Sequence, residues 1–549
     1  MGCTASTPAI IVDGTSSGSS ANAAEKGNGT SSGSTMTSTG SARSIASSIA
    51  STRSQFSRAS SKQKTLRVSG CASSPLCCGP LMLALEAKNP NIEVCDEALP
   101  LDASTAEPFA TPMLEVLGQL KVTESTAMLR YIALKYCKPL YPSANPVTCY
   151  RIDYAIDDFF STVYRPHVAL VSPLLGVCDV LSQDNATLYA TCTTQWMQTH
   201  LRGKFVTGDS VSIADFQIVP FFFQAMQPAV QEKAGFTPPQ RMIEYCQDFQ
   251  QAVKQSLILT MRERGASIAD AMAEASEAIG KVDIEPTGTL EVRSLQWPSR
   301  ATIREPQTAT APAATKERLP ANLPKVHGMP CTAGSCGPVI FGMHTGTAQM
   351  VFCNVMKGEN KTLKFKAINA AGTVPALEDG AARGGESTAI LRYLSMKNHS
   401  QYYPQKDLEQ RCRIDAAMEA FVGEVCCWHQ ETVDVAMGFR DIPDSKTLDD
   451  ACAKYVQNLC KWMREHVSGK FVAGDTLSIA DFKVAPYLYA AMQPVVQNAL
   501  GITIPTRVVQ YCRDFCGEVS SSALLHSAGG SSIAEHAASL EGRFFSYRV

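Results

Sequence analysis

The chain has 549 residues, of which 45% are hydrophobic and 18% charged, and its formal net charge is -2. This length is too great for one hydrophobic core and predicts two to four domains, while the near-neutral charge gives no indication of a nucleic-acid partner. The sequence has no long apolar run and no apolar segment after a basic start, so we expect neither a transmembrane helix nor a secretory signal. Its 20 cysteines are then expected to be reduced thiols.

The N-terminal segment is rich in Ser, Thr, Gly and Ala and is predicted to be a disordered tail. Its first six residues, Met-Gly-Cys-Thr-Ala-Ser, fit the pattern for N-myristoylation at Gly2, and Cys3 is a candidate for palmitoylation. One acyl chain binds a membrane only marginally, so stable anchoring requires both positions. The sequence therefore predicts that lipids on Gly2 and Cys3 hold the protein at the cytoplasmic face of a membrane.

The rest of the chain contains an internal repeat. The stretch Gly-Lys-Phe-Val-Thr-Gly-Asp-Ser-Val-Ser-Ile-Ala-Asp-Phe at 203–216 returns, with three changes, at 469–482. Residues 124–131 return at 386–393, and Cys-Gly-Pro occurs at both 78–80 and 336–338. Several motifs repeated in the same order predict two copies of one fold.

Each copy is expected to begin with strands and to continue with helices. Two early strands are predicted per copy, at 66–68 and 92–94 in the first and at 325–327 and 363–365 in the second. A helix is predicted to start at Glu124-Ser125 and at Glu386-Ser387, and long periodic apolar patterns indicate helices beyond it. Ser212 with Asp215, and Ser478 with Asp481, are predicted to form helix capping boxes.

These patterns divide the chain into seven predicted segments. They are a tail at 1–62, a first α/β half at 63–142, a first helical half at 143–256, a helix and linker at 257–322, a second α/β half at 323–404, a second helical half at 405–520 and a C-terminal tail at 521–549.

The order of the motifs resembles the glutathione S-transferase family. A proline is followed by Glu-Ser-x-Ala-[Met/Ile]-Leu-Arg-Tyr, by Gly-x-x-x-x-Gly-Asp and by Ser-Ile-Ala-Asp-Phe, and the resemblance spans 66 to about 250 and 325 to about 516. It implies a duplicated fold in which each copy has a thioredoxin-like α/β half that holds the glutathione site. An all-α half that forms the co-substrate site would follow in each copy.

The glutathione site can be predicted residue by residue. A helix N-terminus favours an anion, so Ser125 and Ser387 would receive the γ-glutamyl carboxylate, and the preceding glutamates would neutralise its ammonium. The alternative is an ordinary helix cap. Two prolines resemble the cis-proline of the family, which exposes the preceding backbone to the cysteinyl main chain. The predicted binding residues are Thr111, Pro112, Glu124, Ser125, Val374, Pro375, Glu386 and Ser387.

The group that would activate the thiol is less clearly marked. The family places a Tyr, Ser or Cys just after the first strand, and neither copy has the Tyr. A hydroxyl would stabilise the thiolate and a Cys would form a mixed disulfide, whereas the alternative is small residues that pack a tight turn. The candidates are Ser74, Cys77, Cys78, Ser335 and Cys336. No cysteine cluster has the spacing of metal ligands.

Two functions are compatible with these features. The first is a membrane-tethered protein that binds glutathione or a related thiol as substrate, with transferase or thiol-exchange activity and no separate cofactor. The alternative is a non-catalytic adaptor for a protein partner, like the elongation-factor subunits that resemble this family, and a dimer is also possible. The first copy departs more from the family, at Met113 and Lys121, so we expect its site to be weaker or lost.

Overall fold

The computed structural model describes residues 66–96, 111–175, 183–254, 323–329, 332–519 and 521. All of the described residues belong to one compact unit. We call the described residues 66–254 repeat 1 and the described residues 323–521 repeat 2. The predicted lipidation sites Gly2 and Cys3 lie outside the described residues, as does the whole of the helix and linker predicted at 257–322. No helix within the described ranges is long and apolar enough to span a bilayer.

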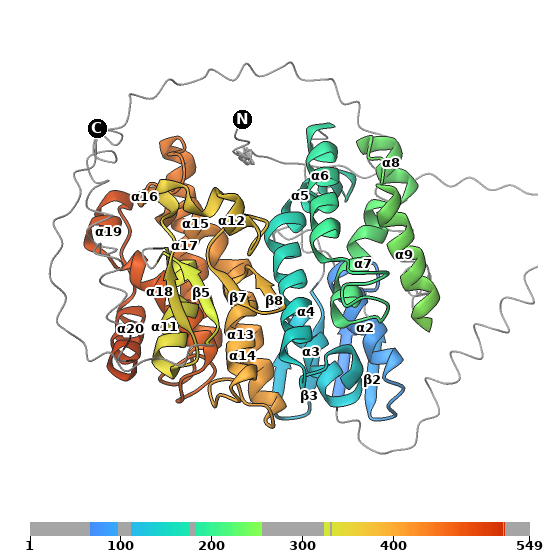
Figure 1. Cartoon of the computed structure of the whole chain (residues 1–549), viewed down its shortest axis with the longest axis horizontal. Coiled ribbons are helices and arrows are strands. Elements are labelled where there is room, and N and C mark those ends of the chain that lie inside the picture. The colour runs from blue at the N-terminus through green and yellow to red at the C-terminus, as the bar shows by residue number, and fades with distance from the viewer. Residues whose placement is uncertain are drawn as a thin grey trace, which may run out of the picture. The chain divides into compact units, whose positions relative to one another are not determined.

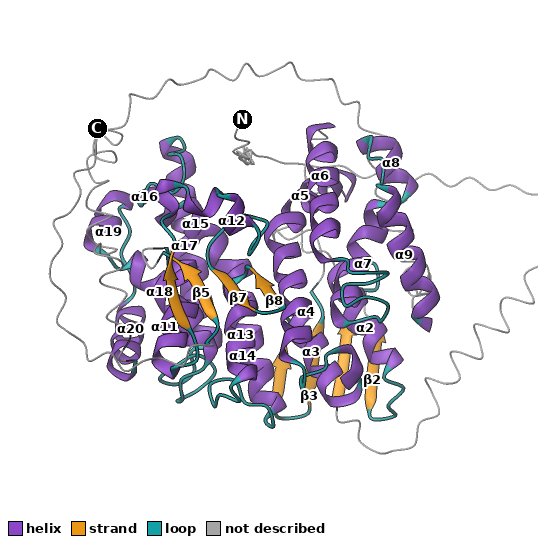
Figure 2. Cartoon of the chain, in the orientation of Figure 1, coloured by secondary structure: helices purple, strands orange, loops and turns teal. Residues whose placement is uncertain are grey.

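Each repeat begins with a four-stranded sheet (Figure 2). The strands of repeat 1 are β1 (Leu66–Gly70), β2 (Ile92–Asp96), β3 (Met113–Val116) and β4 (Leu120–Val122), in the order β2-β1-β3-β4. Those of repeat 2 are β5 (Lys325–Gly328), β6 (Gln349–Phe352), β7 (Ala376–Asp379) and β8 (Ala382–Gly384), in the order β6-β5-β7-β8. In both sheets the first two strands are parallel and the other pairs antiparallel.

One predicted strand is wrong. Residues 363–365 belong to the short helix α12 (Leu363–Lys366), and the second strand of repeat 2 is β6. The Thr362 side chain accepts a hydrogen bond from the Phe365 amide at 3.3 Å and so caps a helical turn. Leu363 is 88% exposed, so Phe365 alone anchors the turn in the core, and an apolar-polar-apolar triplet does not by itself specify a strand.

Helices make up the regular structure after β4 and β8 within the described ranges, which confirms an α/β half followed by an all-α half (Figure 1). The helices of repeat 1 are α2 (Pro75–Glu86), α3 (Ser125–Tyr136), α4 (Pro146–Asp158), α5 (Tyr164–Val171), α6 (Gln183–His200), α7 (Ile213–Ala225), α8 (Pro228–Ala234) and α9 (Gln240–Ala252). Those of repeat 2, besides α12, are α11 (Ala333–Thr345), α13 (Ser387–Lys397), α14 (Leu408–Ala420), α15 (Cys427–Glu431), α16 (Val433–Ala436), α17 (Ser445–His466), α18 (Ile479–Ala491), α19 (Pro494–Leu500) and α20 (Thr506–Glu518). A short π-helical segment follows each of two helices: η2 (Phe159–Val163) continues α4, and η7 (Phe421–Cys426) continues α14.

Both predicted capping boxes are present, at the starts of α7 and α18. The Ser212 amide donates to Asp215 at 2.7 Å, and the Ser478 amide donates to Asp481 at the same distance. Both aspartates are fully buried, and each also accepts from a tyrosine hydroxyl of the last helix of its repeat. The boxes therefore fix the start of the helix that packs on the α/β half.

The repeated Cys-Gly-Pro motif has a packing role. A Cβ on Gly79 would lie 2.5 Å from the carbonyl oxygen of Phe216 in α7, and a Cβ on Gly337 would meet the carbonyl of Phe482 in α18 even more closely. Only glycine lets the backbones of α2 and α7, and of α11 and α18, approach to this distance. The motif thus joins the two halves of each repeat.

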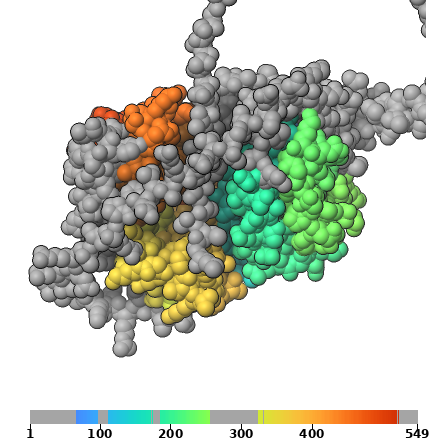
Figure 3. Space-filling model, turned by 90° about the horizontal axis from the view of Figure 1, so that it is seen from above, coloured from blue at the N-terminus to red at the C-terminus, as the bar shows by residue number. Residues whose placement is uncertain are grey.

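The two repeats pair through α3 and α4 of repeat 1 and α13 and α14 of repeat 2 (Figure 1). In the space-filling view the yellow and orange residues of repeat 2 lie beside the teal and green residues of repeat 1 (Figure 3). Arg130 Nε donates to Asp153 Oδ1 at 2.9 Å, and the equivalent Arg392 Nε donates to Asp415 Oδ1 at 2.8 Å. Each arginine also reaches across the interface: Arg130 pairs with Glu419, and Arg392 Nη1 lies 3.6 Å from Asp157 Oδ2.

Each of these residues has a counterpart in the other repeat, because 124–131 matches 386–393 and the motifs around it keep the same spacing. The same surface of each copy therefore forms the contact, as in a two-fold dimer, but within one chain.

Candidate functional site

The helix starts predicted at the two Glu-Ser pairs are present. Ser125 is the first residue of α3 and Ser387 the first of α13, and both are buried. Glu124 and Glu386 precede them and are half-buried. The first-turn amides of both helices therefore lie where the family resemblance implies the γ-glutamyl carboxylate.

The turn before the helix differs between the repeats. Glu386 has φ 64°, in the left-handed region, whereas Glu124 has an extended conformation with φ -79°. In repeat 2 the preceding glycines touch α4 of repeat 1. Tyr150 Oη donates to the Gly385 carbonyl at 3.1 Å, and any Cβ on Gly384 would collide with the Tyr154 ring. Repeat 1 therefore holds the turn that presents Glu386 and Ser387.

The prolines differ as well. Val374–Pro375 is a cis peptide bond, as predicted, and it is the one cis bond among the described residues, so the same prediction for Thr111–Pro112 is wrong. In repeat 2 the buried Asn369 Nδ2 donates to the Thr373 carbonyl at 2.8 Å and holds the loop before Pro375. No such contact holds Thr111 in the described part of repeat 1.

A buried lysine lies beside Ser387. Lys483 of α18 is 6% exposed, and its Nζ donates to Ser387 Oγ at 2.6 Å. Gln217, its counterpart in repeat 1, accepts from Thr126 Oγ1 at 3.5 Å. The sequence analysis missed Lys483, although a lysine among the apolar residues after Ser-Ile-Ala-Asp-Phe, where the first copy has a glutamine, is a recognisable signal.

The carboxyl group of Glu386 has an acidic environment. Burial and the carboxylates of Asp158 and Asp157 raise the pKa of Glu386 to about 8, against the opposing effect of the Lys483 ammonium. Both aspartates lie at the end of α4, in repeat 1. Glu386 is therefore mostly protonated at neutral pH, and its state depends on the pairing of the repeats.

The five candidates for thiol activation all lie inside the α/β halves. Ser74, Cys77, Cys78, Ser335 and Cys336 are between 0% and 4% exposed. Cys78 Sγ donates to the Ala72 carbonyl at 2.7 Å, and Ser335 Oγ accepts from Thr332 Oγ1 at 2.8 Å. The structure thus supports the packing alternative. Ser73 was not singled out from the sequence, but it is half-buried, with its hydroxyl 2.7 Å from Cys71 Sγ.

In repeat 1 an aromatic cluster joins α7 to η2 and α5. The rings of Phe160, Tyr164 and Phe221 contact one another, with centroids 5.3 to 6.1 Å apart. Glu419 of repeat 2 also accepts from the Ala127 amide at 2.9 Å and so satisfies a free donor in the first turn of α3. A carboxylate of the protein therefore already occupies this helix N-terminus.

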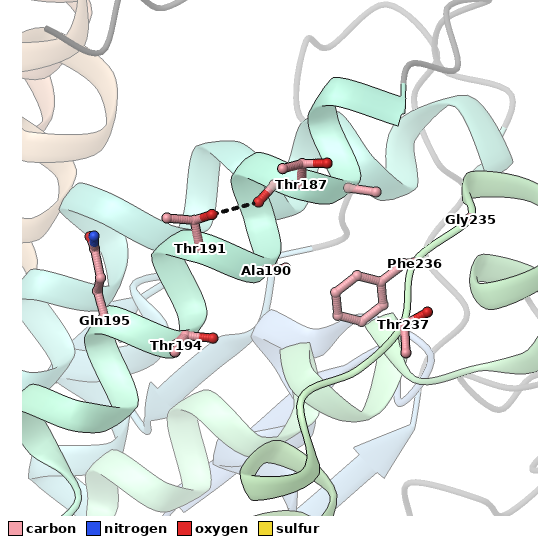
Figure 4. Close-up of a pocket in the computed structure, with 9 residues that line it drawn as sticks. Thr187, Ala190, Thr191, Thr194, Gln195, Gly235, Phe236 and Thr237 are labelled. Carbon is pink, nitrogen blue, oxygen red and sulfur yellow. Dashed lines mark hydrogen bonds between the residues drawn. The ribbon is translucent and has the colours of Figure 1, made fainter. Parts of the chain in front are cut away.

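A shallow depression elsewhere in repeat 1 carries no comparable chemistry (Figure 4). It is lined by Ala186, Thr187, Ala190, Thr191, Thr194, Gln195, Gly235, Phe236 and Thr237. None of these side chains is ionisable, and Thr191 donates to the Thr187 carbonyl of its own helix at 2.9 Å. No group of His, Cys, Asp or Glu in the described ranges could hold a metal ion, and the cysteines described there form no disulfide with one another.

Comparisons with known proteins agree with the motifs. The chain is 25% identical over 175 residues to glutathione S-transferase F10 of Arabidopsis thaliana, covering 30% of this chain and 80% of that protein. It is 32% identical over 145 residues to glutathione S-transferase theta-3 of Mus musculus, covering 24% and 58%. The crystal structure of glutathione transferase F2 from Populus trichocarpa aligns with 37% of this chain and 97% of its own, at 21% identity and a TM-score of 0.33.

No family model matches the chain. The alignments to curated transferases, together with the two sheets and the helical halves that follow them, identify the chain as a homologue of the glutathione S-transferases with two thioredoxin-like units in tandem.

Proposed function

We propose that repeat 2 binds glutathione or a related γ-glutamyl thiol, and that repeat 1 completes this site without binding a ligand of its own. The observation that carries the proposal is the turn at Glu386-Ser387, which Tyr150 and Tyr154 of repeat 1 hold in place at the N-terminus of α13. Free amides and a serine hydroxyl at a helix N-terminus suit a carboxylate. The family resemblance implies that the Val374 backbone, beside the cis-proline, would pair with the ligand main chain.

Titration calorimetry of the full chain with glutathione tests this proposal. Ser387→Ala should weaken binding about ten- to a hundredfold, because a charge-assisted hydrogen bond is worth roughly 1.5–3 kcal/mol. Ser125→Ala is the matched control and should leave the affinity unchanged. Absence of heat at millimolar glutathione from folded protein, or an equal loss in both variants, would contradict the proposal.

The second candidate function is a non-catalytic adaptor for a protein partner, and the burial of all five candidate thiols and hydroxyls favours it. A buried thiol is protonated and inaccessible, so it does not exchange with a ligand disulfide. A conjugation assay with an electrophilic aromatic substrate separates the two functions. Binding without turnover would indicate the adaptor, whereas turnover would establish conjugation. Thiol transfer needs a separate assay with a small disulfide substrate, in which exchange that Cys336→Ser abolishes would establish transfer through Cys336.

We also propose that acyl chains on Gly2 and Cys3 anchor the protein to the cytoplasmic face of a membrane. The sequence pattern at the N-terminus supports this proposal. Gly2→Ala should move the protein wholly into the soluble fraction of a cell extract, and Cys3→Ser should weaken retention because one chain holds only marginally. Unchanged fractionation of Gly2→Ala would refute the anchor.

A further inference from the structure

Two polar residues lie one turn apart on α18, on the side that faces the α/β half of repeat 2. Lys483 and Tyr487 are at positions i and i+4, so their side chains project from the same face of the helix. The first copy has Gln217 and Phe221 at the equivalent positions. Repeat 2 therefore has an ammonium and a hydroxyl where repeat 1 has a neutral amide and a hydrocarbon ring.

Lys483 reaches the N-terminus of α13. Its Nζ donates to Ser387 Oγ at 2.6 Å and lies 5.1 Å from the centroid of the Tyr487 ring. None of the salt bridges found among the described residues includes Lys483, although it is only 6% exposed. A buried ammonium without a carboxylate within ion-pair distance is costly, and an anion bound at Ser387 would supply the missing charge.

Tyr487 reaches the N-terminus of the other helix of the α/β half. A Cβ on Gly334, the second residue of α11, would lie 3.2 Å from Tyr487 Oη, so the hydroxyl lies against the first turn of α11. Burial, the nearby Cys426 and Asp434, and a hydrogen bond between the hydroxyl and the Cys426 thiol raise the pKa of Tyr487 well above its usual value, so the hydroxyl stays protonated. Gly334 and Tyr487 are both half-buried, so this end of the pair is accessible to solvent.

We infer that Lys483 and Tyr487 are the ligand-binding residues that the helical half contributes to repeat 2. Lys483, together with Ser387, binds the carboxylate of a small anionic thiol, and Tyr487 donates a hydrogen bond to its sulfur. The thiol proton leaves to solvent, and the hydroxyl together with the first-turn amides of α11 stabilises the thiolate. The inference rests on the proposed function, and it accounts for the absence of a tyrosine after β5.

Variants of repeat 2 that carry the residues found at the equivalent positions of repeat 1 test the inference. Lys483→Gln and Tyr487→Phe each install the side chain that repeat 1 has, and Tyr489→Phe on the same helix is the control. Binding of glutathione and of S-methylglutathione to the full chain is measured by calorimetry, and the thiolate of bound glutathione by its absorbance near 240 nm. Lys483→Gln should weaken both ligands about tenfold or more. Tyr487→Phe should reduce the thiolate absorbance and leave S-methylglutathione binding unchanged.

Stability distinguishes a binding role from a structural one. A lysine kept for its ligand should cost stability in the free protein, so Lys483→Gln, or Lys483→Met if the first variant misfolds, should raise the denaturant midpoint. A lowered midpoint with unchanged affinity would overturn the inference. If Ser387→Ala weakens binding while both α18 variants bind as the wild type does, the inference falls and the proposed function stands. If the wild-type chain binds neither ligand, both fall.

Discussion

Glu386 shows most directly how one repeat acts on a side chain of the other. Its backbone has φ 64°, and the glycines before it contact Tyr150 and Tyr154. Its carboxyl group faces Asp157 and Asp158 of repeat 1 and Lys483 of its own repeat, and the net effect raises the pKa to about 8. The glutamate at the start of α13 is therefore mostly protonated at neutral pH, unlike an ordinary surface glutamate.

Binding of a γ-glutamyl ligand should release a proton from Glu386. The ligand ammonium would favour the charged carboxylate and lower the raised pKa of Glu386, so affinity should increase as the pH rises towards 8. Calorimetry at pH 7 in two buffers with different protonation enthalpies measures the proton count. With S-methylglutathione, which has no thiol proton to lose, we expect a release that disappears in Glu386→Gln and persists in Glu124→Gln. Equal heats in both buffers for the wild-type protein would contradict this expectation.

At the scale of elements, each repeat depends on the contact between its first helix and the helix that starts with the capping box. Gly79 and Gly337 permit this contact, since a Cβ at either position would meet a backbone carbonyl. A backbone carbonyl cannot move aside as a flexible side chain can. The added Cβ would therefore push α2 away from α7, or α11 away from α18.

Gly337→Ala should therefore destabilise the protein, by about 1–3 kcal/mol, because the added methyl group overpacks the contact between α11 and α18. Gly517→Ala in α20 is the matched control. A Cβ there would have no neighbour within 4 Å, so alanine should raise stability by about 0.5–1 kcal/mol through its better helix propensity. Urea unfolding of both variants measures the difference, and a neutral Gly337→Ala would refute the packing role.

The sequence predicts those elements that local signals define. The starts of α3, α13, α7 and α18 follow from Glu-Ser pairs and capping boxes, which act within one helical turn. The strand expected at 363–365 failed because a triplet fits a helical turn as well as a strand. The roles of Tyr150 and Asp157 could not be predicted, because each depends on packing between segments distant in sequence. For Lys483 the sequence marks the unusual residue but not its partner Ser387, which lies 96 residues away.

For the molecule as a whole, buried charges hold the two repeats together. Arg130, Arg392, Asp153 and Asp415 are all buried, and Glu419 bonds to both arginines and to the Ala127 amide. A charge removed from such a network leaves its partners desolvated and unpaired, which costs far more than the loss of an exposed pair.

Glu419→Ala should lower the free energy of unfolding by about 3–5 kcal/mol, since it leaves two buried arginines with fewer partners. Glu518→Ala is the control. It breaks an exposed pair in which Lys470 Nζ lies 2.7 Å from Glu518 Oε1, and it should cost about 1 kcal/mol or less. Chemical denaturation of the full chain measures both, and a Glu419 variant as stable as the Glu518 variant would show that the interface does not depend on this network.

Joining the repeats in one polypeptide has a consequence for how the protein can change over generations. In a dimer of identical chains, every substitution appears on both sides of the symmetry axis, so a lysine placed on one side is accompanied by a second. In this chain each repeat is encoded separately, so a mutation changes one repeat and leaves the other as it was. Repeat 1 can thus keep Gln217 where repeat 2 has Lys483, and Asp157 where repeat 2 has Glu419, so the two repeats can acquire different side chains at equivalent positions.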